Sequence, residues 1–281
     1  MQVYRDLRII TARPTEDEIA LAPHRLYGTV DAAEAFSVGR WVEGASAEIA
    51  AAGAAGALPI VVGGTGLYLR ALTAGLSAIP PVAPGLRERV RREAEGRSPA
   101  ELHAALAAKD PETAARLRPS DPQRIIRAIE IFEATGRPLL HWQQDGREAA
   151  ALAGFDLATV FLAVEREPLR QRIDRRFEAM MAAGALDEVA ALSARGLDPA
   201  LPAMRAHGVP GLLAHIRGEE TLAEAVARGQ RDTRAYAKRQ ETWFRNQMPE
   251  ARWLTPVRAA EVLARWLDAA GAAPFPAASS A

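Results

Sequence analysis

Residues 58–72, L-P-I-V-V-G-G-T-G-L-Y-L-R-A-L, limit the possible folds of this chain more than any other stretch. The uncharged residues 59–62 predict a strand buried on both faces of a parallel sheet. Residues 63–66, G-G-T-G, predict a sharp turn, and the apolar residues after them predict a helix. This order places a loop at the carboxyl edge of an α/β sheet, where glycines allow close approach of a ligand and a helix N-terminus favours an anion. A tight turn with nothing bound explains the stretch equally well.

Composition excludes several classes of protein. The 281 residues contain no cysteine, which excludes a disulfide framework, a thiolate metal site and a cysteine nucleophile. No apolar run approaches the ~20 residues of a membrane span, so we expect a cytoplasmic protein with no membrane partner. The formal net charge of zero argues against nonspecific wrapping of nucleic acid, but it allows a local basic groove. The five histidines lack zinc-ligand spacing, and no G-x-S-x-G or G-x-G-x-x-G motif follows a strand.

Residues 83–150 predict a helical insertion in an α/β domain. Ser98, Asp110 and Asp121 each stand before a proline, the pairing that begins a helix. In the helix that follows Asp121 we expect Ile125, Ile129 and Phe132 to form the buried stripe. Gln123, Arg124 and Arg127 then lie on an exposed side. Taken alone, this helix is explained as well by an ordinary solvated polar face.

The α/β core is predicted to comprise residues 1–82 and to continue, after the insertion, at residues 151–269. Residues 270–281 are predicted to form a disordered tail. Residues 158–165 predict a buried strand, and residues 203–212 predict a loop. Residues 221–246 predict a helix that carries six cations from residue 228 onward, interleaved with Tyr236, Trp243 and Phe244. Cations can contact phosphates, and aromatic rings can stack on bases. Their combination on one helix is typical of a nucleic-acid surface. A charged helix packed by its aromatic residues is an equally good interpretation of this stretch alone.

Seven stretches in order resemble the signatures of one family: M-Q-V-Y-R at 1–5, T-A-R-P-T at 11–15, P-H-R-L at 23–26, G-G-T-G-L-Y-L-R-A-L at 63–72, D-P-Q-R-I-I-R-A-I-E at 121–130, G-A-L-D-E-V at 184–189 and Y-A-K-R-Q-E-T-W-F-R at 236–245. The family is tRNA dimethylallyltransferase, also called tRNA isopentenyltransferase. The resemblance covers residues 1 to about 256.

The resemblance implies a P-loop-NTPase-like parallel sheet with a helical insertion. It implies transfer of a dimethylallyl group from dimethylallyl diphosphate to the exocyclic amine of the adenosine 3′ of the tRNA anticodon. The adenine is flipped out of its loop, and Mg²⁺ helps to stabilise the departing diphosphate. ATP is not implied, and we expect a monomer.

The resemblance also assigns residue roles. Gln2 would touch the flipped adenosine, and Thr65 would line the reaction channel as the catalytic position. The tRNA contacts would come from a set shared between the insertion and the core: Arg87, Gln123, Arg124, Ile125, Ile126, Arg127, Arg205, His207, Lys238, Arg239, Gln240, Trp243 and Arg245. Near Arg205 the family usually reads R-x-x-G-Y, whereas this chain reads R-A-H-G-V-P and lacks that tyrosine. His207 could supply a ring in its place.

The sequence departs from the family at its beginning. The family opens with a strand, a G-x-T-x-x-G-K-[ST] phosphate loop and a second strand that ends in Asp-Ser, directly before M-Q-V-Y. These 281 residues contain no such loop. We therefore expect a core without its first strands, no diphosphate cradle or general base, and no activity of the chain as written. A non-catalytic tRNA-binding protein is the alternative, and the basic aromatic helix disfavours a small-molecule kinase.

Overall fold

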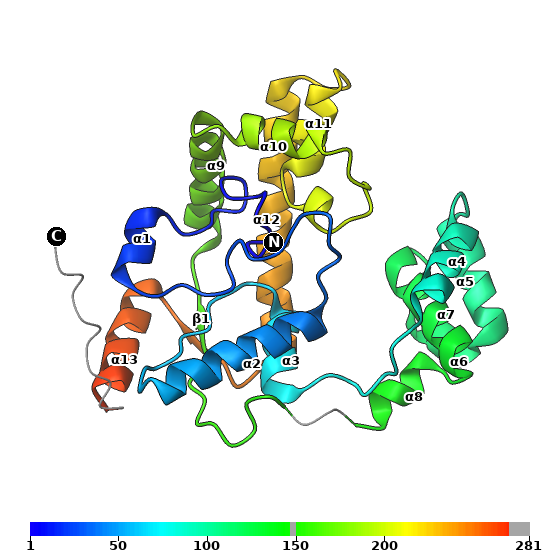
Figure 1. Ribbon diagram of the computed structural model, residues 1–281, viewed down its shortest axis with the longest axis horizontal. Helices are drawn as coiled ribbons and strands as arrows, with labels where there is room; N and C mark the ends of the chain where they lie inside the picture. The colour runs from blue at the N-terminus through cyan, green and yellow to red at the C-terminus, as the bar shows by residue number, and fades with distance from the viewer. Residues whose placement is uncertain (147–149, 270–281) are drawn as a thin grey trace. The chain divides into compact units, whose positions relative to one another are not determined.

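The computed structural model describes residues 1–146 and 150–269, so the predicted tail at 270–281 lies outside the described residues (Figure 1). The chain forms two compact units. Unit 1 comprises Met1–Leu72 and the described part of Gly154–Ala281, and unit 2 comprises the described part of Thr73–Ala153. The described part of the predicted helical insertion at 83–150 lies in unit 2.

Unit 1 is mostly helical, and its long helix α12 packs against α9 and α11 (Figure 1). Its elements are α1 (Glu16–Leu21), α2 (Val38–Ala54), α3 (Gly66–Ala74, which runs into unit 2), β1 (Val160–Leu162), α9 (Arg166–Ala182), α10 (Ala185–Ala194), a 3₁₀ turn (Ala203–Arg205), α11 (Val209–Ile216), α12 (Leu222–Gln247), β2 (Arg252–Leu254) and α13 (Pro256–Ala269). The predicted loop at 203–212 is thus wrong from Val209 onward, where a helix begins with proline in its first turn. Among the described residues no helix is both long and apolar enough to cross a membrane.

The parallel sheet is small. Strands β1 and β2 pair in parallel with Val160 opposite Arg252, and one isolated parallel bridge joins Tyr4 to Val30. The prediction of a buried strand at 59–62 is wrong for the described residues: the segment pairs with no strand, and Ile60 and Val62 are 62% and 74% exposed. A strand requires a hydrogen-bonded neighbour, which local sequence cannot supply. The described residues combine helices with a short parallel sheet, which confirms an α/β chain in coarse form. The P-loop sheet stays a prediction.

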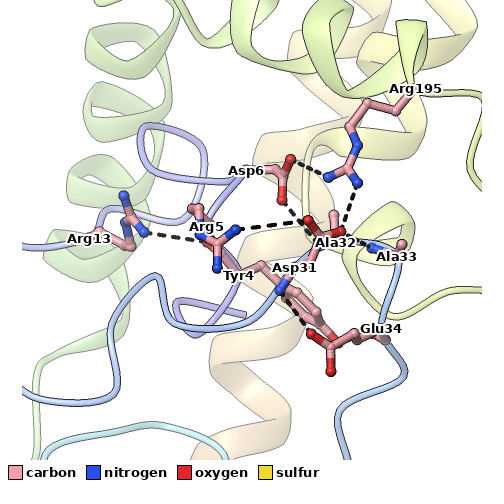
Figure 2. A network of polar contacts seen from close by, with 9 residues as sticks. All are labelled: Tyr4, Arg5, Asp6, Arg13, Asp31, Ala32, Ala33, Glu34 and Arg195. Atoms are coloured by element: carbon pink, nitrogen blue, oxygen red, sulfur yellow. Dashed lines mark hydrogen bonds and ion pairs between the residues drawn. The ribbon is translucent and has the colours of Figure 1, made fainter.

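The N-terminal loop is held in place by a polar network. The Arg195 guanidinium donates to the carboxylates of both Asp6 and Asp31, and Asp6 accepts the N–H of Ala32 at 3.0 Å (Figure 2). The Arg195 cation and the N–H of Ala33 lower the pKa of Asp31. This network ties residues 4–6 and 31–34 to the end of α10.

A second carboxylate organises the same loop. Glu188 on α10 accepts the backbone N–H groups of Arg8 and Ile9 at 2.7 Å and that of Ile10 at 3.0 Å. Three consecutive N–H groups would otherwise lack a partner in a loop. The stretch G-A-L-D-E-V thus has a structural task here, which sequence pattern alone did not indicate.

Unit 2 is built from α4 (Pro84–Ala94), α5 (Pro99–Lys109), α6 (Pro111–Arg116), α7 (Pro122–Thr135) and α8 (Leu139–Gln144). The prediction that Ser98, Asp110 and Asp121 begin three of these helices is confirmed, since each side chain accepts a backbone N–H of the first turn. Helix α7 ends at Gly136, whose left-handed φ of +66° favours glycine. Its predicted stripe is confirmed for Ile125 and Ile129, which are buried in the core of the unit.

Candidate functional site

The glycine turn at 63–66 lies against one face of α12. The carbonyl oxygen of Gly64 accepts a hydrogen bond from Gln240 Nε2 at 2.8 Å and another from the Tyr236 hydroxyl at 3.3 Å. The segment before the turn makes no strand pairing in the described residues, so these side chains fix the turn in place of a sheet.

The turn approaches α12 closely at Gly64 and Gly66. A Cβ atom on Gly66 would lie 2.1 Å from the Trp243 ring, and one on Gly64 would lie 1.9 Å from Gln240 Nε2. Gly63 differs, because a Cβ atom there would meet nothing within 4 Å. Gly64 and Gly66 therefore let α12 come close to the backbone.

Tyr236 joins the turn to a second loop. Its ring centroid lies 4.8 Å from that of His207, and the Arg239 guanidinium lies 5.7 Å from the Tyr236 ring centroid. Burial, followed by the nearby Arg239 cation, lowers the pKa of His207, so this ring is uncharged at neutral pH. Tyr236, Gln240 and Trp243 recur at i, i+4 and i+7, the spacing of one helix face, and this signal could have identified Tyr236 as a member of the site.

The predicted cations of unit 1 lie at the surface. Lys238, Arg239 and Arg245 are exposed on α12, and Arg205 is exposed on the 3₁₀ turn. Arg245 pairs with Glu241 at 2.9 Å and lies over the Trp253 ring. Helix α12 thus presents cations to solvent while Gln240 and Trp243 face the turn.

Thr65 and Gln2 have different settings. Thr65 is exposed between the two close glycines, and its carbonyl accepts the Tyr68 N–H at 2.9 Å at the start of α3. The side-chain amide of Gln2 donates to the Ala12 carbonyl at 2.7 Å, and the backbone carbonyl of Gln2 accepts the Gly28 N–H. Gln2 therefore braces its loop in this structure.

In unit 2 the start of α7 divides into two faces. Gln123 and Arg124 are exposed, and Arg124 pairs with Asp121 at 3.3 Å. Ile126 is half-buried against the core of the unit, and Ile125 is fully buried. The side chain of Ile125 therefore supports the helix and is covered from any ligand.

Arg87 and Arg127 meet at a buried carboxylate that sequence reasoning missed. Glu130 is 2% exposed and pairs with both, and also with Arg91. On α4, Arg91 follows Arg87 by one turn, and on α7, Glu130 follows Arg127 by nearly one turn. This spacing of charges at i, i+4 and i, i+3 is the sequence signal that could have identified the cluster.

The described residues do not offer a set of metal ligands. They contain no group of three or more His, Cys, Asp or Glu side chains placed to hold one ion. The expected Mg²⁺ therefore stays a prediction.

The close contact at Gly66 gives a first prediction. We expect Gly66→Ala to lower the free energy of unfolding by about 1–3 kcal/mol, because the new methyl must displace Trp243. Gly63→Ala is the matched control, and we expect it to change stability by no more than about 0.5 kcal/mol. Urea unfolding followed by tryptophan fluorescence measures both. Equal stability of the two variants would contradict the packing described here.

Comparison with known proteins identifies relatives of this chain. A family model described as IPP transferase matches residues 2–247. The tRNA dimethylallyltransferase of Rhodopseudomonas palustris is 61% identical over 259 residues, which cover 92% of this chain and 80% of that relative.

Two solved structures are similar to the chain. The tRNA delta(2)-isopentenylpyrophosphate transferase of Staphylococcus epidermidis is 29% identical with a TM-score of 0.64, over 96% of this chain and 88% of that one. A eukaryotic dimethylallyltransferase acting on tRNA is 27% identical with a TM-score of 0.74, over 92% of this chain and 66% of that one. The chain therefore belongs to the IPP transferase family, the family of the tRNA dimethylallyltransferases.

Proposed function

We propose that the protein serves the transfer of a dimethylallyl group from dimethylallyl diphosphate to the exocyclic amine of the adenosine 3′ of the tRNA anticodon. The observation that carries this proposal is the glycine turn held against the basic aromatic helix by Gln240 and Tyr236. It joins a glycine turn, on which Thr65 is exposed, to a helix with cations and rings suited to RNA.

The reaction requires no covalent intermediate with the protein. The adenine amine nitrogen forms a bond to the allylic carbon, the bond from that carbon to the diphosphate oxygen breaks, and its electron pair leaves with the diphosphate. The amine then loses a proton to solvent water. In this proposal Thr65 lines the path of the reacting groups, and Gln2 lies near the flipped adenosine.

RNA contacts are proposed for the exposed members of the predicted set. In unit 1 these are Arg205, Lys238, Arg239 and Arg245, with the uncharged His207 ring available for stacking. In unit 2 they are Gln123 and Arg124, which are exposed, and Arg87 and Arg127, whose side chains are 42% and 40% exposed. Ile125 is not among them, because its side chain is buried.

We further propose that residues 1–281 alone bind tRNA without transferring the dimethylallyl group. The sequence contains no lysine-bearing phosphate loop, and the turn at 63–66 has no lysine to replace it. Stabilisation of the developing charge on the leaving group is usually a large part of catalysis, since one lost donor costs on the order of 10²–10³ in rate.

A transfer assay tests this second proposal. We expect residues 1–281, supplied with unmodified tRNA, dimethylallyl diphosphate and Mg²⁺, to give no product above a protein-free control. Fusing the phosphate-loop segment of a relative ahead of Met1 should give product, and Thr65→Ala in that fusion should slow transfer more than it weakens tRNA binding. Clear turnover by residues 1–281 would show that other groups hold the diphosphate and accept the proton.

RNA binding is tested separately by Arg124→Ala. We expect several-fold weaker binding of an anticodon stem-loop, and a plot of log K against log salt whose slope is less steep by about 1, because one phosphate contact is lost. The matched control is Arg258→Ala on α13, because both arginines are exposed and each pairs with a carboxylate three residues away in the sequence. If both variants bind like the parent, the polar face of α7 is simply solvated.

A further inference from the structure

We propose that Glu130 is a positioning residue that gathers Arg87, Arg91 and Arg127 into one cluster for the RNA backbone, and that Arg91 is a phosphate contact as well. The proposal rests on the proposed tRNA binding and adds to it a residue and the organisation of this surface. It lies entirely within unit 2.

The cluster is built at the contact between α4 and α7. Glu130 Oε1 accepts a hydrogen bond from Arg91 Nε at 3.2 Å, and Oε2 accepts one from an Arg127 guanidinium nitrogen at 3.1 Å. Arg87 Nε lies 3.8 Å from Oε2, too far for a hydrogen bond. The same nitrogen is buried without a hydrogen-bond partner.

Burial separates the two signs of charge. The carboxylate side chain of Glu130 is 3% exposed, whereas the side chains of Arg87, Arg91 and Arg127 are 42%, 61% and 40% exposed. The anion thus lies beneath and the cations face solvent. Three positive charges against one negative leave a surplus of two on this surface.

The hydrogen-bonding groups are equally unbalanced. Each guanidinium has five N–H donors, and one carboxylate can accept at about four sites. Most of the donors of the cluster therefore remain available to a second acceptor. Guanidinium groups match phosphate oxygens in a planar, two-pronged geometry, which favours the phosphates of an RNA backbone as that acceptor.

A neighbouring network shows what a purely structural cluster looks like. Glu133, also on α7, pairs with Arg89 and Lys109, and Arg89 pairs in turn with Glu93. Two cations face two carboxylates there, so the network is neutral. The Lys109 cation, with Arg89, lowers the pKa of Glu133. Glu133 is therefore the matched control for Glu130.

Whether Glu130→Gln weakens or tightens RNA binding distinguishes a positioning role of Glu130 from a simple effect of its charge. Removing a negative charge should by itself tighten RNA binding. We expect instead binding weaker by about 3- to 10-fold, with a salt slope less steep by about 1 to 2, because three like charges without their shared anion move apart. Glu133→Gln should leave the salt slope unchanged. Unchanged or tighter binding by a folded Glu130→Gln would overturn the proposal.

Two further variants keep the test decisive. Glu130→Asp retains the charge, and we expect it to recover most of the salt slope. Arg91→Gln leaves Glu130 with two partners, so the unit keeps its internal pairing, and we expect the slope to fall by about 1. If Glu130→Gln does not fold, as judged by circular dichroism, an Arg91→Gln variant that binds like the parent overturns the proposal. A parent that binds no RNA overturns the proposed function and the cluster together.

Discussion

The contact between the glycine turn and α12 is the interaction on which the candidate site in unit 1 depends. One carbonyl, that of Gly64, accepts from two side chains of the helix, and Trp243 covers Gly66 at a distance that no Cβ atom tolerates. The turn is thus positioned by side chains of a helix some 170 residues later in the chain. Thr65 lies between the two constrained glycines, so its position is set by α12.

The same helix has a second face with a different task. Tyr236, Gln240 and Trp243 are directed to the turn and to His207, while Lys238, Arg239 and Arg245 are exposed. A single helix therefore joins the proposed RNA surface to the proposed reaction channel. Substitutions on the first face should act on the geometry of the turn, and substitutions on the second on the binding of phosphates.

Local sequence predicted the helices and their ends well, because capping depends on residues a few positions apart. Asp110 and Asp121 illustrate this, since each satisfies an N–H in the next turn. The strand expected at 59–62 failed because strand formation needs a partner, and no described segment pairs with it. Glu130 was overlooked because its importance comes from a second helix, α4, which supplies two of its three cations.

Hydrogen exchange with and without an unmodified anticodon stem-loop tests the RNA surface proposed for each unit, the polar face of α7 in unit 2 and the basic half of α12 in unit 1. When RNA is bound, we expect slower amide exchange at residues 122–130, 236–245 and the turn at 63–66. Helix α13 should be unaffected. Protection confined to α13 or to other segments, with 122–130 and 236–245 unchanged, would show that RNA does not bind these two helices.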